Sequence, residues 1–285
     1  MRNPSRLFRA PTLAAMLLLG AEVAVTPVVA QADAASDAIL AKTVEQRKAT
    51  NSIQTMTMEV TSRKGRTQTR SLMVKTRVDG QSNYTLAEVV APEDVAGTRF
   101  LARDTAEAAP ELFLYLPRLN RTSKMLAKRA ALLGSDFAPS EMDFSAWEDA
   151  SHTYQGAETI DINGTPVKTE VIESTNSDPD ADYPKAKLWL GADDGFPRRI
   201  EFMEADGTVV KRWNIIEVAT ADEINYPKRS VMETVAKGSK TTLLLENVRF
   251  KVPDAELPLE HFTEAALSTG QNDDSPTSED GAESQ

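Results

Sequence analysis

The sequence contains no cysteine and only two histidines among its 285 residues. Without cysteine the chain has no disulfide, no thiolate metal site, no thiol nucleophile and no attachment site for the lipid of a bacterial lipoprotein. His152 and His261 do not occur in a metal-ligand spacing such as H-E-x-x-H, and no glycine-rich phosphate-binding motif is present. We therefore expect neither a metal ion nor another cofactor.

The sequence also lacks the G-x-S-x-G motif that carries the nucleophile of many hydrolases. Ser135 stands in Gly134-Ser135-Asp136, but the outer neighbours of this triplet are Leu133 and Phe137. A hydrolase that uses Ser135 is therefore the weakest of three functional hypotheses. We expect the protein not to be an enzyme.

The acidic residues do not form a complete calcium loop. Asp178, Asp180 and Asp182 alternate as the first ligands of such a loop do. Tyr183 replaces the required glycine, however, and Trp189 replaces the chelating glutamate. The pattern favours a solvated turn over a cation site.

Positive charge is in deficit, since the formal net charge is −11. A chain with this excess of acid is a poor candidate for coating nucleic acid or an anionic membrane. We therefore expect no nucleic-acid partner, and we expect the protein to be a monomer.

The longest apolar stretch lies near the N-terminus, where three arginines precede Leu13–Gly20 and small residues end at Ala30. This order is that of a cleavable secretory signal peptide. We predict cleavage after Ala30, with Ala32 and Ala34 as alternatives, so residues 1–30 leave and the mature chain carries a net charge of −13. A membrane anchor is disfavoured because the run is shorter than roughly 20 residues and Glu22 interrupts it. We expect an unlipidated protein in the periplasm.

The mature chain begins with one amphipathic helix and continues as β-strands. A capping serine and the spacing of Leu40 and Val44 predict the helix over residues 36–49. Apolar residues then alternate with polar ones from Ile53, and a turn near Gly65 leads to a second strand. Nine further strands are predicted, with turn sequences between several of them, over residues 83–91, 99–103, 111–116, 166–174, 185–190, 198–205, 208–219, 229–236 and 241–250.

Other segments interrupt this series of predicted strands. Residues 117–134 are basic and predicted to be irregular or partly helical, and residues 139–147 and 258–267 favour short helices. Residues 268–285 lack lysine, arginine and every large apolar side chain, which is typical of disorder. We assign residues 31–263 to one folded domain and residues 264–285 to an acidic disordered tail.

About eleven strands, spaced about 4.8 Å apart, form a sheet on the order of 50 Å wide. Three helices side by side cover roughly 30 Å of it. The sheet must therefore curl, either as an open antiparallel half-barrel with short helices capping its concave face or as a sandwich folded on itself. The half-barrel leaves an apolar groove under its helices. The strand residues that we expect to line this groove are Met56, Met58, Val60, Leu72, Val74, Leu188, Leu190, Ile200 and Phe202.

The stretch from Leu112 to Trp147 is the most distinctive. A strand ends in Tyr115-Leu116-Pro117, a basic linker follows, and then come Gly134-Ser135-Asp136-Phe137 and a short apolar helix. This order of features resembles the outer-membrane lipoprotein-sorting family, the LolA-like group, over roughly residues 36–263. Some members of the group are paired with large inner-membrane permeases.

The resemblance implies an open half-barrel whose capped, apolar face carries acyl chains of lipids or lipoproteins through the periplasm toward the outer membrane. In the distinctive stretch, Tyr115, Phe137, Phe144 and Trp147 are added to the expected groove. The runner-up hypothesis is an interaction module of the same fold, which serves an inner-membrane permease or an envelope-stress pathway without cargo.

The basic linker has two interpretations. It is a docking or head-group surface at the mouth of the groove, or it is a solvated loop. Its charged residues are Arg118, Arg121, Lys124, Lys128 and Arg129. In the turn that follows, Ser135 or Asp136 is expected to satisfy free backbone amides, and Phe137 is expected to fix the covering segment.

Overall fold

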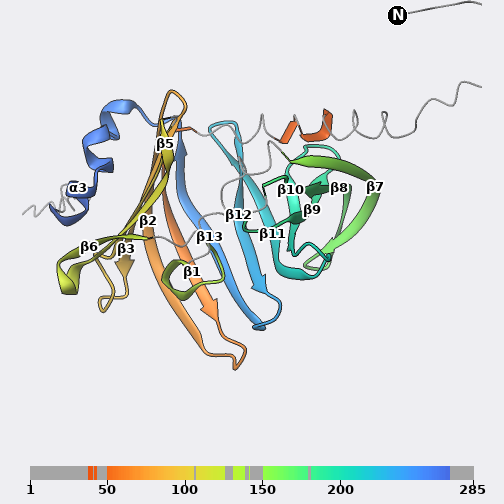
Figure 1. Cartoon of the computed structure of the whole chain (residues 1–285), viewed down its shortest axis with the longest axis horizontal. Coiled ribbons are helices and arrows are strands. Elements are labelled where there is room, and N and C mark those ends of the chain that lie inside the picture. Colours follow the sequence, from red (N-terminus) through yellow and green to blue (C-terminus); the bar gives the residue numbers. More distant parts are fainter. Residues whose placement is uncertain are drawn as a thin grey trace, which may run out of the picture.

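A computed structural model describes residues 38–40, 42–43, 50–105, 107–125, 131–138, 141, 150–178 and 181–269. The predicted signal peptide therefore lies outside the described residues. One open antiparallel sheet of 13 strands dominates the molecule and curls from one edge to the other (Figure 1). The predicted fold class, a mainly β half-barrel with few short helices, is confirmed.

The strands follow one another around the sheet with a single exception. Their order is β6-β5-β4-β3-β2-β1-β13-β12-β11-β10-β9-β8-β7, so the first strand pairs with the last. Their bounds are β1 Ser52–Thr61, β2 Thr67–Asp79, β3 Ser82–Ala91, β4 Arg99–Thr105, β5 Ala108–Leu116, β6 Arg121–Met125, β7 Ser151–Ile162, β8 Thr165–Thr175, β9 Lys185–Gly191, β10 Pro197–Met203, β11 Val209–Ala221, β12 Ile224–Thr234 and β13 Ser239–Phe250.

All eleven predicted strands are present, and the prediction missed β6 and β7, which form the two edges of the sheet. An edge strand has one neighbour and little buried surface, so it need not carry an alternating apolar pattern. The basic residues of β6 and the largely exposed side chains of β7 fit this position. The prediction of irregular or helical structure for residues 117–134 was thus wrong for 121–125. Its helical part was right for η1 (Pro117–Leu119) and η2 (Leu132–Gly134).

The two faces of the sheet carry separate hydrophobic cores. We call the face that bears Met58, Leu72 and Phe202 the inner face, and the face that bears Leu86 and Leu101 the outer face. The largest core lies on the inner face and extends from β3 to β10. Strand alternation accounts for this division, because neighbouring residues point to opposite sides.

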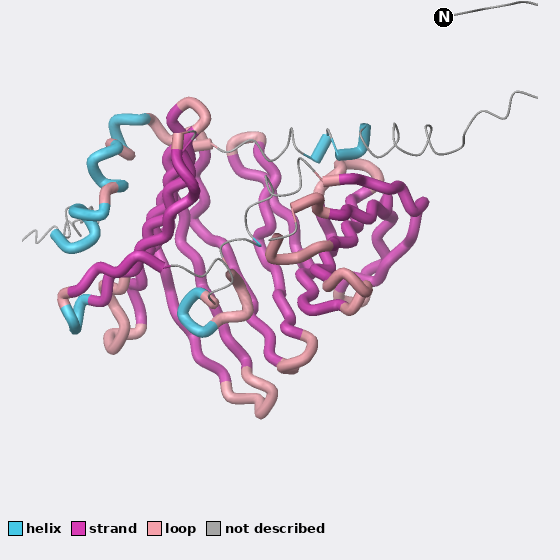
Figure 2. Tube along the Cα trace, in the orientation of Figure 1, coloured by secondary structure: helices cyan, strands magenta, loops and turns pink. Residues whose placement is uncertain are grey.

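The C-terminal helices pack on the outer face, so the prediction that the short helices cap the concave face was wrong for them. They are η4 (Asp254–Glu256), η5 (Leu259–Phe262) and α3 (Glu264–Thr269), and they contribute Phe262 and Leu267 to the core around Leu101. Figure 2 shows them along one side of the sheet. Because Leu267 is buried in α3, the folded part continues to residue 269, beyond the predicted boundary at 263.

The start of the predicted N-terminal helix covers the inner face near β9. Residues 38–40 and 42–43 are helical, and Ile39 and Leu40 pack against Ala186, Leu188 and neighbouring apolar residues. Thr43 donates a hydrogen bond to the carbonyl oxygen of Gly195 at 2.8 Å. Within the described part of the chain, no helix has the length and hydropathy needed to cross a bilayer.

Candidate functional site

The inner face is a continuous apolar surface built from aligned strand residues. Trp213 pairs with Ile200 on one side and with Met232 on the other. Leu243 pairs with Met58 in the next row. Of the expected groove residues, Met56, Met58, Val60, Leu72, Val74, Ile200 and Phe202 all belong to this one cluster. Met56 and Val60 are partly buried and the other five are buried, and the same cluster contains Phe137 of a segment that covers this face.

The covering segment consists of residues 131–138 and Glu141, which follow β6 in the chain. Phe137 is its anchor: the side chain is 2% exposed and packs with its ring at 5.7 Å from that of Trp213, in an edge-to-face arrangement. Ser135 accepts a hydrogen bond from the Phe137 amide at 3.1 Å, which fixes the turn. This contact matches the expectation that Ser135 satisfies a free amide. The described structure gives Ser135 this turn role and shows no catalytic base bonded to it.

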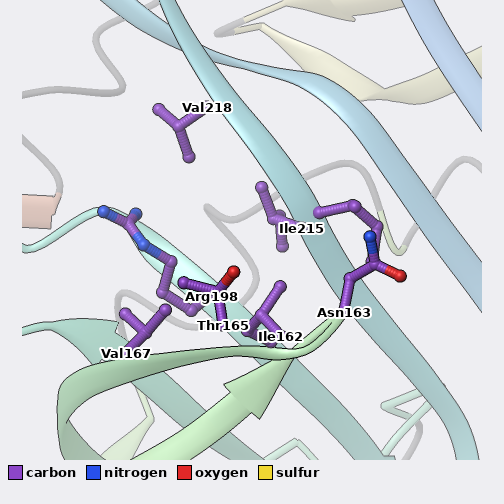
Figure 3. A pocket seen from close by; sticks show the side chains of 8 residues that line it. Ile162, Asn163, Thr165, Val167, Arg198, Ile215 and Val218 are labelled. Carbon is purple, nitrogen blue, oxygen red and sulfur yellow. The ribbon is translucent and has the colours of Figure 1, made fainter.

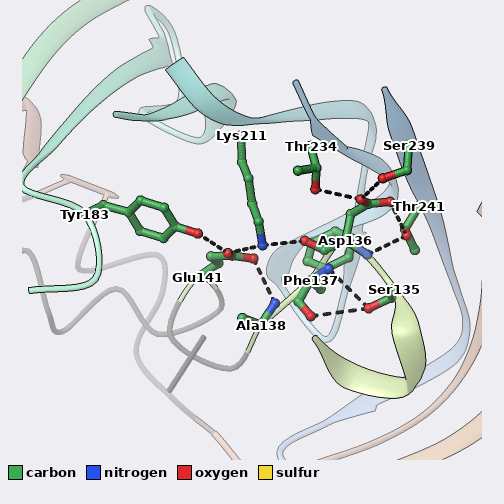
Figure 4. Close-up of polar contacts among 10 residues, drawn as sticks. All are labelled: Ser135, Asp136, Phe137, Ala138, Glu141, Tyr183, Lys211, Thr234, Ser239 and Thr241. Atoms are coloured by element: carbon green, nitrogen blue, oxygen red, sulfur yellow. Dashed lines mark hydrogen bonds and ion pairs between the residues drawn. The ribbon is translucent and has the colours of Figure 1, made fainter. Parts of the chain in front are cut away.

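Asp136 fastens the segment to the sheet through both carboxylate oxygens (Figure 4). Its Oδ1 accepts hydrogen bonds from the hydroxyls of Thr234 at 2.6 Å and Ser239 at 2.5 Å. Its Oδ2 accepts one from Thr241 at 2.9 Å, and the Asp136 amide donates to the Thr241 hydroxyl at 2.8 Å. Hydrogen bonds to an ionised acceptor are roughly twice as strong as neutral ones.

A buried ion pair adds a second fastening. The Lys211 ammonium contacts Glu141 Oε1 and donates to the Asp136 carbonyl oxygen at 2.7 Å. Tyr183 donates to Glu141 Oε1 at 2.5 Å, and the Ala138 amide donates to Oε2 at 2.8 Å. Glu141 is 1% exposed, so its charge depends on these partners. The two carboxylates therefore hold the segment against β11, β12 and β13.

The structure places the remaining predicted groove residues in three ways. Leu188 and Leu190 form a separate cluster with Ile172 and Ala186, under Ile39 and Leu40. Tyr115 lies on the outer face, in the core around Leu101, and is left out of the site. Phe144 and Trp147, with most of the predicted helix over 139–147, lie outside the described residues.

The described basic residues lie at one edge of the sheet. Arg118 in η1 and Arg121 at the start of β6 are exposed, and so is Leu119, whose side chain is 66% exposed. Lys124 in β6 is partly neutralised, because it donates to Glu111 at 2.7 Å across the β5–β6 pair. Lys128 and Arg129 lie outside the described residues. The described residues thus leave two arginines and one leucine open at the β5–β6 turn.

The stability that Glu111 contributes to this edge of the sheet depends on pH. Hydrogen bonds from Lys124 and Arg103 lower its pKa from 4.5 to about 2. A carboxyl group whose pKa is lower in the folded state than in the unfolded state stabilises the folded state at pH values above its unfolded-state pKa. This stabilisation is lost as the pH falls toward the folded-state pKa. The Glu111→Gln variant is therefore expected to unfold at lower urea concentration than the wild type above about pH 4.5. The two midpoints should converge as the pH approaches about 2. A difference that stays constant over this range would contradict the assignment.

A pocket of about 280 Å³ lies where the β7–β8 turn approaches β11 (Figure 3). Its walls mix apolar side chains with Arg198, whose guanidinium already donates to Asp194 at 2.6 Å and to the Phe196 carbonyl oxygen at 3.0 Å. The pocket therefore offers no free charge to a ligand. The lining residues are Ile162, Asn163, Thr165, Val167, Arg198, Ile215, Ile216 and Val218.

Comparison with known proteins places the chain in a family. A family model described as an uncharacterized protein matches residues 81–269, about two thirds of the chain. The chain belongs to this family. No curated protein matches the sequence.

Solved structures share the fold of this chain. A DUF1329 family protein from Desulfovibrio piger is 20% identical, with a TM-score of 0.73, and the match covers 83% of this chain and 99% of that one. A domain ascribed to outer membrane lipoprotein sorting, from Vibrio parahaemolyticus, is 24% identical, with the same TM-score and coverage. A LolA superfamily protein from Nitrosomonas europaea is 18% identical, with a TM-score of 0.61 and coverage of 80% and 97%. At these identities the likeness establishes the fold, and the resemblance noted in the sequence is confirmed: the chain has a LolA-like fold.

Sequence reasoning missed the polar partners of the covering segment. Thr234, Ser239 and Thr241 were not singled out, although Thr241 shares the strand face of Leu243. A hydroxyl at an inward position of an alternating strand is a usable signal, because such a group needs a hydrogen-bond partner when buried. Lys211 carries the same signal on β11, where it precedes the inward-facing Trp213 by two residues.

Proposed function

We propose that the protein is a non-enzymatic periplasmic carrier that binds acyl chains of lipids or lipoproteins on the inner face of its sheet. The observation that carries this proposal is the way in which the covering segment is attached over that face. The hydrogen bonds between the described part of the segment and the sheet all involve a side chain. The segment adds no strand to the sheet, so it can leave while the β-ladders stay intact.

An acyl chain can replace the apolar contacts of the cover. Burying a phenylalanine side chain stabilises a protein by about 1.5–3 kcal/mol, and each buried methylene contributes about 0.8 kcal/mol. Two to four methylenes therefore match the contribution of Phe137. A lipid chain has several times that number, which leaves a surplus for breaking the polar contacts of Asp136 and Glu141.

A reversible cross-link between cover and sheet tests the proposal. The chain has no cysteine, so Asp136→Cys combined with Thr241→Cys introduces the only two. Two hydrogen bonds join these residues, so their side chains are direct neighbours, as a disulfide requires. We expect the oxidised protein to take up no fluorescent phospholipid from vesicles, and the same sample to take it up after reduction.

The reduced protein is the control for the oxidised one, because both carry the same substitutions. Cross-linking is checked by counting free thiols before the lipid is added. Equal lipid uptake in the two redox states would place the cargo elsewhere, and absence of uptake in the reduced state and in the wild type would reject the carrier function.

A second candidate function is the cargo-free interaction module, which the exposed edge at Arg118, Leu119 and Arg121 favours. Reversing both charges, with Arg118→Glu and Arg121→Glu, is expected to abolish co-purification with an integral membrane protein and to leave lipid uptake unchanged. If the protein takes up no lipid but loses its membrane partner in this variant, the module replaces the carrier as the function.

A further inference from the structure

Polar side chains form one complete row across the inner face of three neighbouring strands. Lys211 on β11 pairs in register with Thr234 on β12, and Thr234 pairs with Ser239 on β13. Thr241 lies one inward position further along β13 and is fully buried. This row lies next to the β12–β13 turn, at the end of the otherwise apolar surface.

The protein's own carboxylates occupy this row. Three hydroxyls converge on the two oxygens of Asp136, at 2.5 to 2.9 Å. The Lys211 ammonium, with a side chain 13% exposed, is paired with Glu141. Donors arranged in this way select an anion with several acceptor oxygens, and the carboxylates of the covering segment satisfy that requirement while the face is covered.

We propose that Lys211, Thr234, Ser239 and Thr241 form a binding site for the anionic head group of an acylated ligand, a phosphate or a carboxylate, which takes the place of the Asp136 carboxylate. This inference rests on the proposed carrier function, because the segment must leave the face before the ligand enters. The cover is then an internal competitor that carries the same chemical group as the ligand.

The neighbouring rows orient such a ligand. Successive inward residues of a strand are about 7 Å apart. The row of Trp213, Met232 and Thr241 follows the polar row directly, and Leu243 with Met58 comes next. A head group at Lys211 therefore directs its acyl chain away from the β12–β13 turn and along the apolar rows.

A neutral amphiphile does not fit this arrangement equally well. With the cover displaced, an uncharged head group would leave the Lys211 ammonium without a counter-charge and the hydroxyls with poor acceptors. Unpaired polar groups next to an apolar surface are destabilising. The site should therefore discriminate by head-group charge even where the acyl chains are identical.

Matched lipids test this discrimination. The probes are dioleoyl phosphatidic acid, dioleoylglycerol, which has the same chains without the phosphate, and glycerol 3-phosphate, which has the phosphate without chains. We expect the wild type to bind phosphatidic acid about tenfold more tightly than dioleoylglycerol, the change that one charged interaction typically produces. Glycerol 3-phosphate is expected to bind far more weakly than either lipid.

Two sets of variants locate the preference. Because the same donors also hold the cover, the readout is the ratio of the two affinities. Lys211→Met, and separately Thr234→Val with Ser239→Ala, should abolish the roughly tenfold preference for phosphatidic acid over dioleoylglycerol. The second set keeps Lys211 and its Glu141 partner, so it remains informative if Lys211→Met does not fold. Lys240→Met and Thr242→Val, on the opposite face of β13, are the controls and should leave both affinities unchanged.

The outcomes separate this site from the carrier function. Equal affinity of the wild type for the two lipids, or an unchanged preference for phosphatidic acid in the variants, overturns the anion site and leaves the carrier in place. Binding of glycerol 3-phosphate as tight as that of phosphatidic acid, lost in the same variants, retains the anion site and rejects acyl-chain carriage. Binding of none of the three probes overturns both.

Discussion

Replacing Glu141 with leucine is expected to lower the free energy of unfolding by about 3–5 kcal/mol, which is the typical loss when one partner of a buried ion pair is removed. The Lys211 ammonium would remain in a nearly enclosed position with only the Asp136 carbonyl oxygen as a described partner. The Tyr183 hydroxyl and the Ala138 amide would each lose a hydrogen bond to Glu141 as well. Urea unfolding of the wild type and the variant measures the difference.

Two further variants show whether the loss comes from the buried charge. Combining Glu141→Leu with Lys211→Met removes both charges and should recover a large part of the stability, because no ammonium is then left unpaired. Glu201→Leu removes one of the two acidic partners of Arg212, whose side chain is more open to solvent than that of Lys211, and should lower the free energy of unfolding by about 1 kcal/mol or less. Equal losses for Glu141→Leu and Glu201→Leu would contradict the role given to Glu141.

Replacing Phe137 with alanine is expected to lower the free energy of unfolding by about 3–5 kcal/mol and to uncover the inner face. The ring is almost fully enclosed against Trp213 in the largest core, so its removal leaves a cavity as well as a lost contact. Binding of an apolar fluorescent dye under native conditions should rise, because the covering segment loses its main apolar anchor.

The matched control is Phe113→Ala in the core of the outer face. It should lower the stability by a similar amount, since Phe113 is 4% exposed. It should not increase dye binding to the native protein, because the covering segment keeps all its contacts. An increase of dye binding in the Phe113 variant as large as in the Phe137 variant would show that the dye reports general loosening and not the cover.

The architecture was largely predictable because most strands carry their own signal. Apolar alternation identified the strands from β1 to β5 and from β8 to β13, and the width of such a sheet led to the curled form. The two edge strands were not predicted because they bury little surface. Most residues of β6 are basic or polar, and most side chains of β7 are exposed. The sequence also did not predict on which face the C-terminal helices pack. The sheet has a hydrophobic core on each face, and the apolar side of a helix fits either of them.

The site was predictable only in part. Alternation correctly grouped Met58, Leu72 and Phe202 on one face, and the glycine-containing turn before Phe137 pointed to a fixed cover. The same pattern could not show that Tyr115 belongs to the other face, because the sequence assigned it by resemblance and not by its register with Arg99. Nor could the apolar alternation show which polar groups of the sheet bind the covering segment.

By itself the sequence determined the class of the fold, the absence of cysteine chemistry and the residues that form an apolar sheet face, because each of these depends on composition or on a repeat of two residues along one strand. Only the tertiary structure decided which polar groups meet. Asp136 lies 98 to 105 residues from the three hydroxyls that bind it. Alternation gives each of these residues a side of the sheet, whereas strand order and register, which depend on the whole chain, bring them within hydrogen-bond distance.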